Sequence, residues 1–395
     1  MWITRVLGDC PRCSARQTYG NASISNNILL RGCMVCRHHE EFWLPDLHKK
    51  IIYLDQSFFS GAFRARDPRF VHAAEHIKSA TGNQLLVAPY SSLHEDETHQ
   101  WRGHDGKLPS DLMSFIKQAS GGNEFEADYE VERRQIVKAF KAYLVKEPAT
   151  YVLDSKDVLR GNIHKWENYI FISIDGYFRD IEELRNAKAD AVSTLIHAFD
   201  EWQTSNNSFE EDVNIENRAA GRIYIQLYLE MLGKIAGGDY YAYLNAPIAT
   251  TIVDAMRGCL SKEMPLTDQL EVCAQFFNSP HFFEVPSHWV SAHIYATLKH
   301  QVKHGSYANR EEAKKRLSGI FFDVKHISLY GPYCDAITVD GPMADLILQP
   351  TVNLQARYGT SVFSVGTFDQ LENWLEQLKA NMSEEHAEAV RRAYG

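Results

Sequence analysis

The sequence predicts an α/β protein whose parallel sheet, with flanking helices, is interrupted by a large helical insert. Two observations support this fold class. Short apolar segments of strand type lie at 51–54, 85–88, 336–339 and 361–364, and each is bounded by turn or helix-start residues. Between about residues 105 and 285 the apolar periodicity is almost entirely helical. The two strand-bearing flanks therefore form one α/β domain, and the helices between them form an insert.

The chain begins with a separate module that contains four of its seven cysteines. Cys10 and Cys13 form one Cys-x2-Cys pair, Cys33 and Cys36 form another, and 19 residues separate the pairs. This spacing is typical of a tetrahedral four-thiolate zinc site. A pair of disulfides is disfavoured in a reducing compartment, and a redox dithiol needs no duplicate. We therefore expect a small zinc ribbon, in which a structural Zn²⁺ lets roughly 40 residues fold without a core of their own.

The charge of the chain is unevenly distributed. A formal net charge of −10 argues against a general affinity for nucleic acid. Residues 1–39, however, hold one acid and five arginines: Arg5, Arg12, Arg16, Arg31 and Arg37. The basic charge of this module leaves open a local contact with nucleic acid or with a partner protein. The sequence has neither a signal peptide pattern nor an apolar stretch near the ~20 residues of a membrane span, so we expect a cytoplasmic protein with no membrane partner.

Carboxylates flank the predicted strands. Asp55 follows the strand 51–54, and Asp335 and Asp340 stand on either side of the strand 336–339. We expect these acids to gather at one edge of the parallel sheet, where α/β proteins place their chemistry. A carboxylate cluster suits Mg²⁺ or Mn²⁺, hard ions that take oxygen ligands. For Asp55 an N-cap role at the following helix remains an equal alternative.

The helical insert and the C-terminal segment complete the predicted organisation. Two apolar helix faces are expected in the insert, one containing Ile136, Ala139, Phe140, Tyr143 and Leu144 and one containing Ile223, Leu227, Met231 and Ile235. A packed helix with Thr367 as N-cap is expected after the last strand. The predicted boundaries are 1–46 for the zinc ribbon, 47–110 and 285–380 for the α/β domain, 111–284 for the insert and 381–395 for a C-terminal helix or tail.

The flanks resemble the PIN-like nuclease family. The resemblance rests on Tyr53-Leu54-Asp55, on the segment 89–97 entering a helix, on the segment 335–340, and on the last strand 361–364 with its helix. It implies a parallel sheet whose carboxylates hold one or two divalent ions that activate water for phosphodiester cleavage. Position by position, it implies Asp55 as the first acid, Asp335 as the third and Asp340 as the fourth.

The second acid of the family pattern falls in the run Glu95-Asp96-Glu97. Glu97 lies three residues after His94 on one helical face, and its two neighbours point elsewhere. We therefore prefer Glu97, with Glu95 in reserve. Positive side chains are expected to border the acids, and the candidates are Arg64, Arg66, Arg69, Lys303, Lys314, Lys315, Arg316 and Lys325.

These features predict a divalent-metal-dependent endonuclease that hydrolyses single-stranded nucleic acid, with RNA favoured over DNA. A zinc ribbon fused to such a nuclease would suit a toxin or antiviral defence effector as well as an RNA-processing enzyme. The alternatives are a catalytically inactive PIN-like regulator that binds nucleic acid or protein, and a phosphohydrolase acting on nucleotides. A partner protein or a homo-oligomer remains open.

Overall fold

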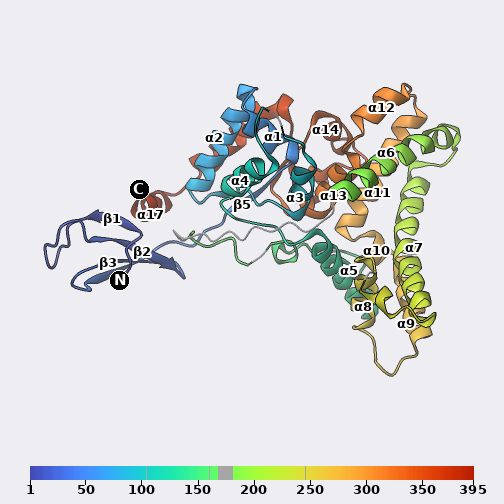
Figure 1. Cartoon of the computed structure of the whole chain (residues 1–395), viewed down its shortest axis with the longest axis horizontal. Coiled ribbons are helices and arrows are strands. Elements are labelled where there is room, and N and C mark those ends of the chain that lie inside the picture. Colours follow the sequence, from blue (N-terminus) through green and yellow to red (C-terminus); the bar gives the residue numbers. More distant parts are fainter. Residues whose placement is uncertain (104, 160, 168–180, 245) are drawn as a thin grey trace.

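The computed structural model describes residues 1–103, 105–159, 161–167, 181–244 and 246–395. It confirms a mixed α/β fold with two sheets, each of four strands. An antiparallel sheet lies at one end of an elongated molecule, the parallel sheet with its helices lies in the middle, and a block of helices lies at the other end (Figure 1). No helix in these described segments is both long and apolar enough to cross a membrane.

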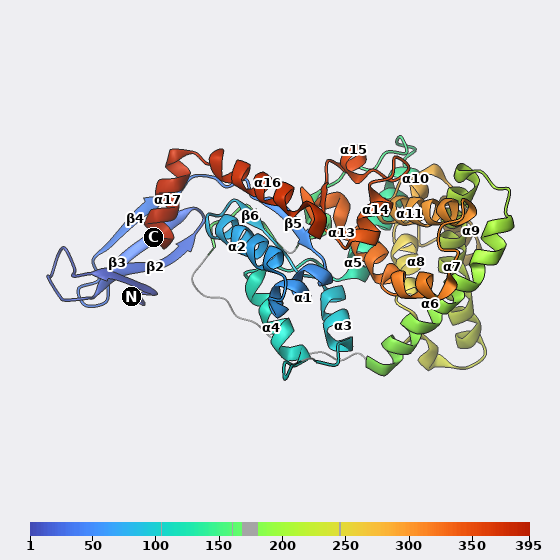
Figure 2. The same ribbon diagram turned by 90° about the horizontal axis from the view of Figure 1, so that it is seen from above.

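The N-terminal sheet shares its core with the last helix of the chain. Its strands are β1 (Arg5–Gly8), β2 (Tyr19–Ser25), β3 (Ile28–Cys33) and β4 (His39–Trp43), in that spatial order. Helix α17 (Glu384–Tyr394) lies beside this sheet (Figure 2). The two parts bury a common apolar cluster: Ile24, Leu29, Leu44, Leu47, Trp166, Ala389 and Ala393. The module therefore has a core, but part of it comes from the other end of the chain.

Polar side chains of the module also cap the end of α17. Asn21 Nδ2 donates to the carbonyl oxygen of Ala393 at 2.8 Å, and Arg31 Nη2 donates to that of Arg392 at 2.6 Å. Arg5 donates to the carbonyl oxygen of Tyr394. The last carbonyls of a helix lack partners within the helix and carry partial negative charge, so donors and cations stabilise them. Two of the five arginines of the module are thus engaged within the protein.

The central sheet is parallel, as the sequence predicts. Its strands are β5 (Lys50–Leu54), β6 (Leu86–Val87), β7 (Ala336–Thr338) and β8 (Ser361–Phe363), and the spatial order is β6-β5-β7-β8. The pairing of Ile52 with Ala336 and of Leu54 with Thr338 joins the two flanks of the insert at the centre of the sheet. The carboxyl ends of β5 and β7 consequently lie at one edge.

Helices cover both faces of this sheet. Successive side chains of a strand alternate between faces, and Ile51 and Tyr53 enter one apolar cluster while Ile52 and Leu54 enter another. The Ile52 face is covered by α1 (Gln56–Arg64), α2 (Pro68–Gly82), α4 (Pro109–Ala119) and α16 (Phe368–Ala380). The Tyr53 face is covered by α3 (Ser92–Gln100), α6 (Ile181–Thr204), α11 (Pro286–Lys303), α13 (Ile320–Tyr330) and α14 (Gly341–Ile347).

The insert has a core of its own, but it is smaller than predicted. This core is built from α5 (Asp128–Leu144), α7 (Phe209–Ala236), α8 (Ala249–Arg257), α9 (Leu266–Phe277) and α10 (Pro280–Phe283). Helix α6 and nearly all of α4 fall within the predicted range 111–284, but both pack against the sheet. The remaining α-helices of the described segments are α12 (Arg310–Arg316) and α15 (Leu354–Tyr358).

One predicted helix face of the insert differs from the observed one. Ile136, Ala139 and Phe140 of α5 are buried as expected. On α7, however, Tyr224, Tyr228 and Met231 face the core, whereas Ile223 is 53% exposed. Tyrosine carries enough apolar surface to occupy a core position when its hydroxyl finds a partner. A pattern based on aliphatic residues alone therefore misplaced this face.

Candidate active site and metal centres

Two of the predicted acids lie at the carboxyl edge of the sheet, and both are helix N-caps. Asp55 follows β5, and its carboxylate accepts hydrogen bonds from the backbone N–H of Phe58 at 2.9 Å and from Ser57 Oγ at 2.8 Å. Asp340 follows β7 and accepts one from the backbone N–H of Met343 at 2.8 Å. The capping role and a role in a site are therefore compatible, because each cap fixes the carboxylate at this edge.

An acidic cleft with a volume of about 550 Å³ opens at the same edge. The carboxylates that line it are Asp55, Glu97, Glu312, Asp323 and Asp340. They come from segments on both sides of the insert, since Glu97 lies on α3 and Asp323 on α13. Asp323 was missed in the sequence because no strand precedes it. The only signal was a single acid within the apolar run Ile320–Val324, three residues before His326.

Asp335 and Glu95 do not line this cleft. Asp335 stands at the amino end of β7, where it accepts hydrogen bonds from the backbone N–H of Ile51 at 2.8 Å and from Lys50 Nζ at 2.7 Å. Five residues of extended chain, at about 3.3 Å each, separate it from Asp340, so the two carboxylates lie at opposite edges. Glu95 lies near Lys117 and Glu124, and burial raises its pKa. Of the acids expected on α3, Glu97 is the one at the cleft.

The acids of the cleft are crowded. The pKa of Asp55 is raised to about 7, mainly by its withdrawal from water; hydrogen bonds from Phe58 and Ser57 oppose this shift, and the charges of Asp340 and Glu97 contribute to it. Burial also raises the pKa of Asp340, with a further contribution from Asp345. Both shifts disfavour the charged carboxylates, so a bound cation would relieve the cost.

The donor set of the cleft consists of oxygen atoms and suits Mg²⁺ or Mn²⁺. Within the described residues, however, these carboxylates are not among the groups whose ligand atoms all lie within 4.8 Å of one another. Magnesium usually keeps several waters and needs only one or two carboxylates from the protein. An ion in this cleft would therefore have to keep several water ligands, because the carboxylates do not converge closely enough to surround it.

Two buried histidines contact the segments that carry these acids. His94 Nε2 donates to the carbonyl oxygen of Leu54 at 2.8 Å, and its Nδ1 accepts from the backbone N–H of Ser91 at 2.9 Å. His326 Nε2 lies 3.2 Å from Glu97 Oε2. Burial lowers the pKa of His94 to about 4 and that of His326 to about 3, so both rings are neutral. His326 therefore contacts Glu97, but these two atoms do not form a hydrogen bond.

Two of the predicted cations reach the cleft. Lys315 and Arg316, on the last turn of α12, line it together with the acids. Four other candidates pair with acids elsewhere, in the ion pairs Arg66–Asp105, Arg69–Asp67, Lys303–Asp212 and Lys325–Asp128. The cleft thus contains both a group of carboxylates and two positive side chains from helix α12.

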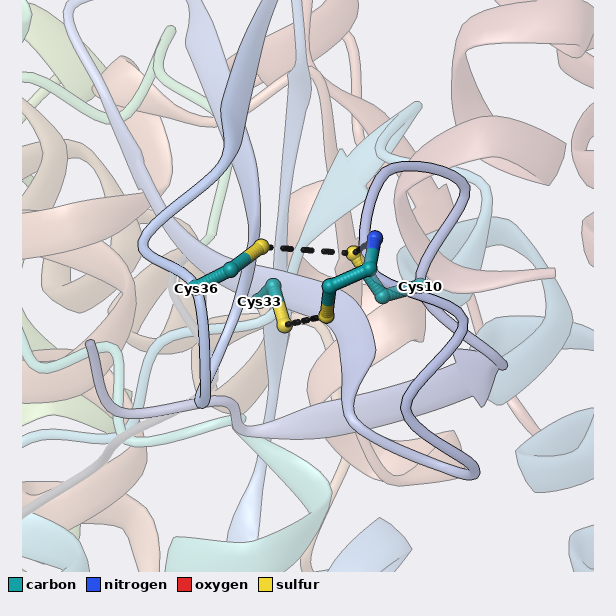
Figure 3. A group of neighbouring side chains, drawn as sticks. Cys10, Cys33 and Cys36 are labelled. Carbon is teal, nitrogen blue, oxygen red and sulfur yellow. Dashed lines mark hydrogen bonds between the residues drawn. The ribbon is translucent and has the colours of Figure 1, made fainter.

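The four N-terminal cysteines form a second group. Figure 3 shows Cys36 facing Cys10, with their sulfur atoms 3.6 Å apart, and the sulfur atoms of Cys13 and Cys33 are 3.8 Å apart. A tetrahedral zinc with Zn–S bonds of about 2.3 Å requires S–S separations of about 3.8 Å. Backbone N–H groups of Arg12 and Cys13 also point at the Cys10 sulfur. The four cysteines lie close enough together to bind a metal such as zinc.

Comparison with protein-family models, with curated proteins and with solved structures gives no match. The assignment of a function therefore rests on the geometry of the cleft and of the cysteine group. Together they define an α/β protein with an acidic, oxygen-rich cleft at the carboxyl edge of a parallel sheet.

Proposed function

We propose that this protein is a divalent-metal-dependent nuclease of the PIN-like kind that cleaves single-stranded nucleic acid, with RNA favoured over DNA. The observation that supports this proposal is the cleft itself. Asp55, Glu97, Asp323 and Asp340 come from four separate segments and line one hollow at the carboxyl edge of the sheet, beside Lys315 and Arg316. The acids of the cleft would hold a cation, and this cation and the neighbouring positive side chains would together balance the negative charge of a phosphate substrate.

The residues of the cleft have distinct roles in this proposal. Asp55 and Asp340 would hold the ion, because their capping hydrogen bonds fix them in place. Glu97 and Asp323 would hold its water ligands. A bound Mg²⁺ or Mn²⁺ would acidify a water molecule and balance the charge that develops on the scissile phosphate. Lys315 and Arg316 would contact the phosphates on either side of the scissile bond.

We further propose that the cysteine group binds one structural Zn²⁺ and that residues 1–46 form a zinc ribbon. Four thiolates leave no open coordination position, which favours a structural role. Arg5 and Arg31 hold helix α17, so a contact with nucleic acid would fall to the exposed side chains of Arg12, Arg16 and Arg37.

The decisive experiment uses matched aspartates at the two edges of the sheet. Asp55→Asn, Asp323→Asn and Asp340→Asn should each lower Mn²⁺-dependent cleavage of a labelled single-stranded RNA by at least about 100-fold, because each removes a charge from the cleft. Asp335→Asn makes the same chemical change at the opposite edge and should cleave within a few-fold of wild type.

Circular dichroism and melting temperature would show that each variant is folded. Full activity of Asp55→Asn or Asp340→Asn would rule out this site, and so would cleavage that persists when Mg²⁺ and Mn²⁺ are removed. A loss in Asp335→Asn equal to the losses at the cleft would indicate that the substitutions act through folding.

One observation favours the alternative of a PIN-like protein that binds without cutting. The carboxylate oxygens of the cleft do not converge as closely as the cysteine sulfurs do. A protein of this kind would bind single-stranded RNA through Lys315 and Arg316 and would leave it intact at every Mn²⁺ concentration. Binding and cleavage measured on the same labelled RNA distinguish the two functions.

A further inference from the structure

Two histidines and a glutamate form a third group of ligand-type side chains, away from both the cleft and the cysteines. His72 and His76 lie on α2, and Glu372 lies on α16. One nitrogen from each ring and one carboxylate oxygen all lie within 4.8 Å of one another. His72 Nδ1 is 2.7 Å from Glu372 Oε1, and the two imidazole centroids are 4.7 Å apart.

The surrounding fold fixes these side chains opposite each other. Residues four apart lie on the same face of a helix, so His72 and His76 point in one direction from α2. The same helix buries Ala73 and Ile77 in the core under the sheet, and α16 buries Leu371 in that core. The two helices lie side by side along the sheet (Figure 2). Both backbones are thus held by packing, independently of any ion.

We propose that His72, His76 and Glu372 bind one divalent transition-metal ion of the Zn²⁺, Co²⁺ or Ni²⁺ class. Imidazole nitrogen suits these ions better than it suits Mg²⁺ or Ca²⁺. At a tetrahedral ion, metal–ligand bonds of about 2.0–2.2 Å place adjacent ligand atoms about 3.3–3.6 Å apart. This range lies between the 2.7 Å that separates His72 Nδ1 from Glu372 Oε1 and the 4.8 Å within which all three ligand atoms lie. His72 is exposed enough for its ring to rotate and adjust its distance to an ion.

Three protein ligands leave a coordination position open. A hollow of about 440 Å³ borders His72 and Glu372, and Arg69 and Asp369 also line it. Water or a small anion can therefore complete the coordination of the ion. Such a site is accessible and exchangeable, in contrast to the closed four-thiolate group.

The site would join distant parts of the chain. His72 and Glu372 are 300 residues apart in sequence and belong to the two flanks that the insert separates. An ion shared by α2 and α16 would cross-link the two flanks on the Ile52 face of the sheet. Because the ion binds the folded state only, it should stabilise the α/β domain by an amount that rises with the logarithm of the free ion concentration above the Kd. This inference does not depend on the proposed nuclease activity.

The test titrates Co²⁺ into the full chain, with zinc already bound at the cysteines, and follows visible absorption and melting temperature. Wild type should bind one Co²⁺ more than His76→Ala or Glu372→Gln. The new bands should lack the near-ultraviolet thiolate charge-transfer absorption that Co²⁺ at the cysteines would give. The melting temperature of wild type should rise by several degrees more with Co²⁺ than that of either variant, because the acidic cleft is unchanged in all three proteins.

Glu376→Gln is the matched control. Glu376 is exposed on the same helix, one turn further on, and lies outside the group, so this variant should behave as wild type does. Glu372→Gln keeps the size of the side chain and should fold normally, which separates loss of the ion from loss of structure. Equal Co²⁺ stoichiometry and equal melting shifts in wild type, His76→Ala and Glu372→Gln would overturn the proposal.

Discussion

Replacing Asp55 with Asn tests the electrostatic description of the cleft, because it removes one negative charge and nearly preserves shape. Asn is also a good N-cap, so the hydrogen bond from the Phe58 N–H can be retained. The charged side chains that line the cleft with Asp55 come from α3, α12, α13 and the cap of α14: Glu97, Glu312, Lys315, Arg316, Asp323 and Asp340. The negative side chains outnumber the positive ones.

The size of the effect follows from the pKa of Asp55, which burial and the neighbouring acids raise from 3.8 to about 7. A raised pKa means that the folded protein binds a proton more tightly than the unfolded chain does. The free energy of unfolding therefore falls as the pH rises from about 4 to about 7, and it stays at the lower value above that range. At about 1.4 kcal/mol per tenfold change in proton affinity, the full loss is about 4 kcal/mol. Asp55 is only half-buried, and screening by water reduces the expected loss to about 2 kcal/mol.

Urea denaturation followed by tryptophan fluorescence measures this loss. Zinc-loaded wild type and Asp55→Asn would be compared without Mg²⁺ or Mn²⁺ at about pH 5 and about pH 8. The two proteins share all other titrating groups, so the change in their stability difference isolates Asp55. We expect the variant to gain about 1 kcal/mol relative to wild type at the higher pH, because part of the loss has already occurred below pH 5. Added Mg²⁺ should stabilise wild type and have little effect on the variant. The same pH dependence in both proteins would refute the reasoning.

Two further predictions concern the zinc module and the cations of the cleft. Cys33→Ser should reduce the zinc content from about one ion per chain to near zero. Hydrogen exchange should then show lost protection in both the N-terminal sheet and α17, because Asn21 and Arg31 join them. Full protection of α17 in this variant would contradict the coupling. Lys315→Ala and Arg316→Ala should each weaken the binding of single-stranded RNA, measured by fluorescence anisotropy. Each should also reduce the number of counterions released on binding, read from the slope of affinity against salt concentration, by about one. An unchanged slope would show that the RNA binds elsewhere.

The strands of the central sheet were predictable from sequence because they are short, apolar and bounded by clear turn and cap residues. Asp55 and Asp340 illustrate why these boundaries carry information. Each ends a buried strand and accepts the first N–H groups of a helix, so its position at the carboxyl edge follows from local structure alone. Parallel pairing then brings the two ends together.

The positions of two acids were not predicted correctly from the sequence, for different reasons. Asp323 reaches the cleft from the first turn of helix α13, and only the packing of that helix on the sheet brings this acid to the same cleft as Asp55. Asp335 was assigned to the wrong edge, although strand polarity alone argues against it: in a parallel sheet, a residue before a strand lies at the opposite edge from a residue after it. At that edge, Lys50 Nζ and the backbone N–H of Ile51 donate hydrogen bonds to the carboxylate of Asp335 and hold it in place.

The division of the acids between the two flanks couples the cleft to the folding of the whole domain. Asp55 and Glu97 come from the first flank, and Asp323 and Asp340 come from the second. Before β5 pairs with β7, neither flank presents more than two of these acids, and each carboxylate remains in water at its ordinary pKa. Pairing creates both the crowding and the cleft. A cation that binds the assembled acids therefore favours the paired state over the separate flanks.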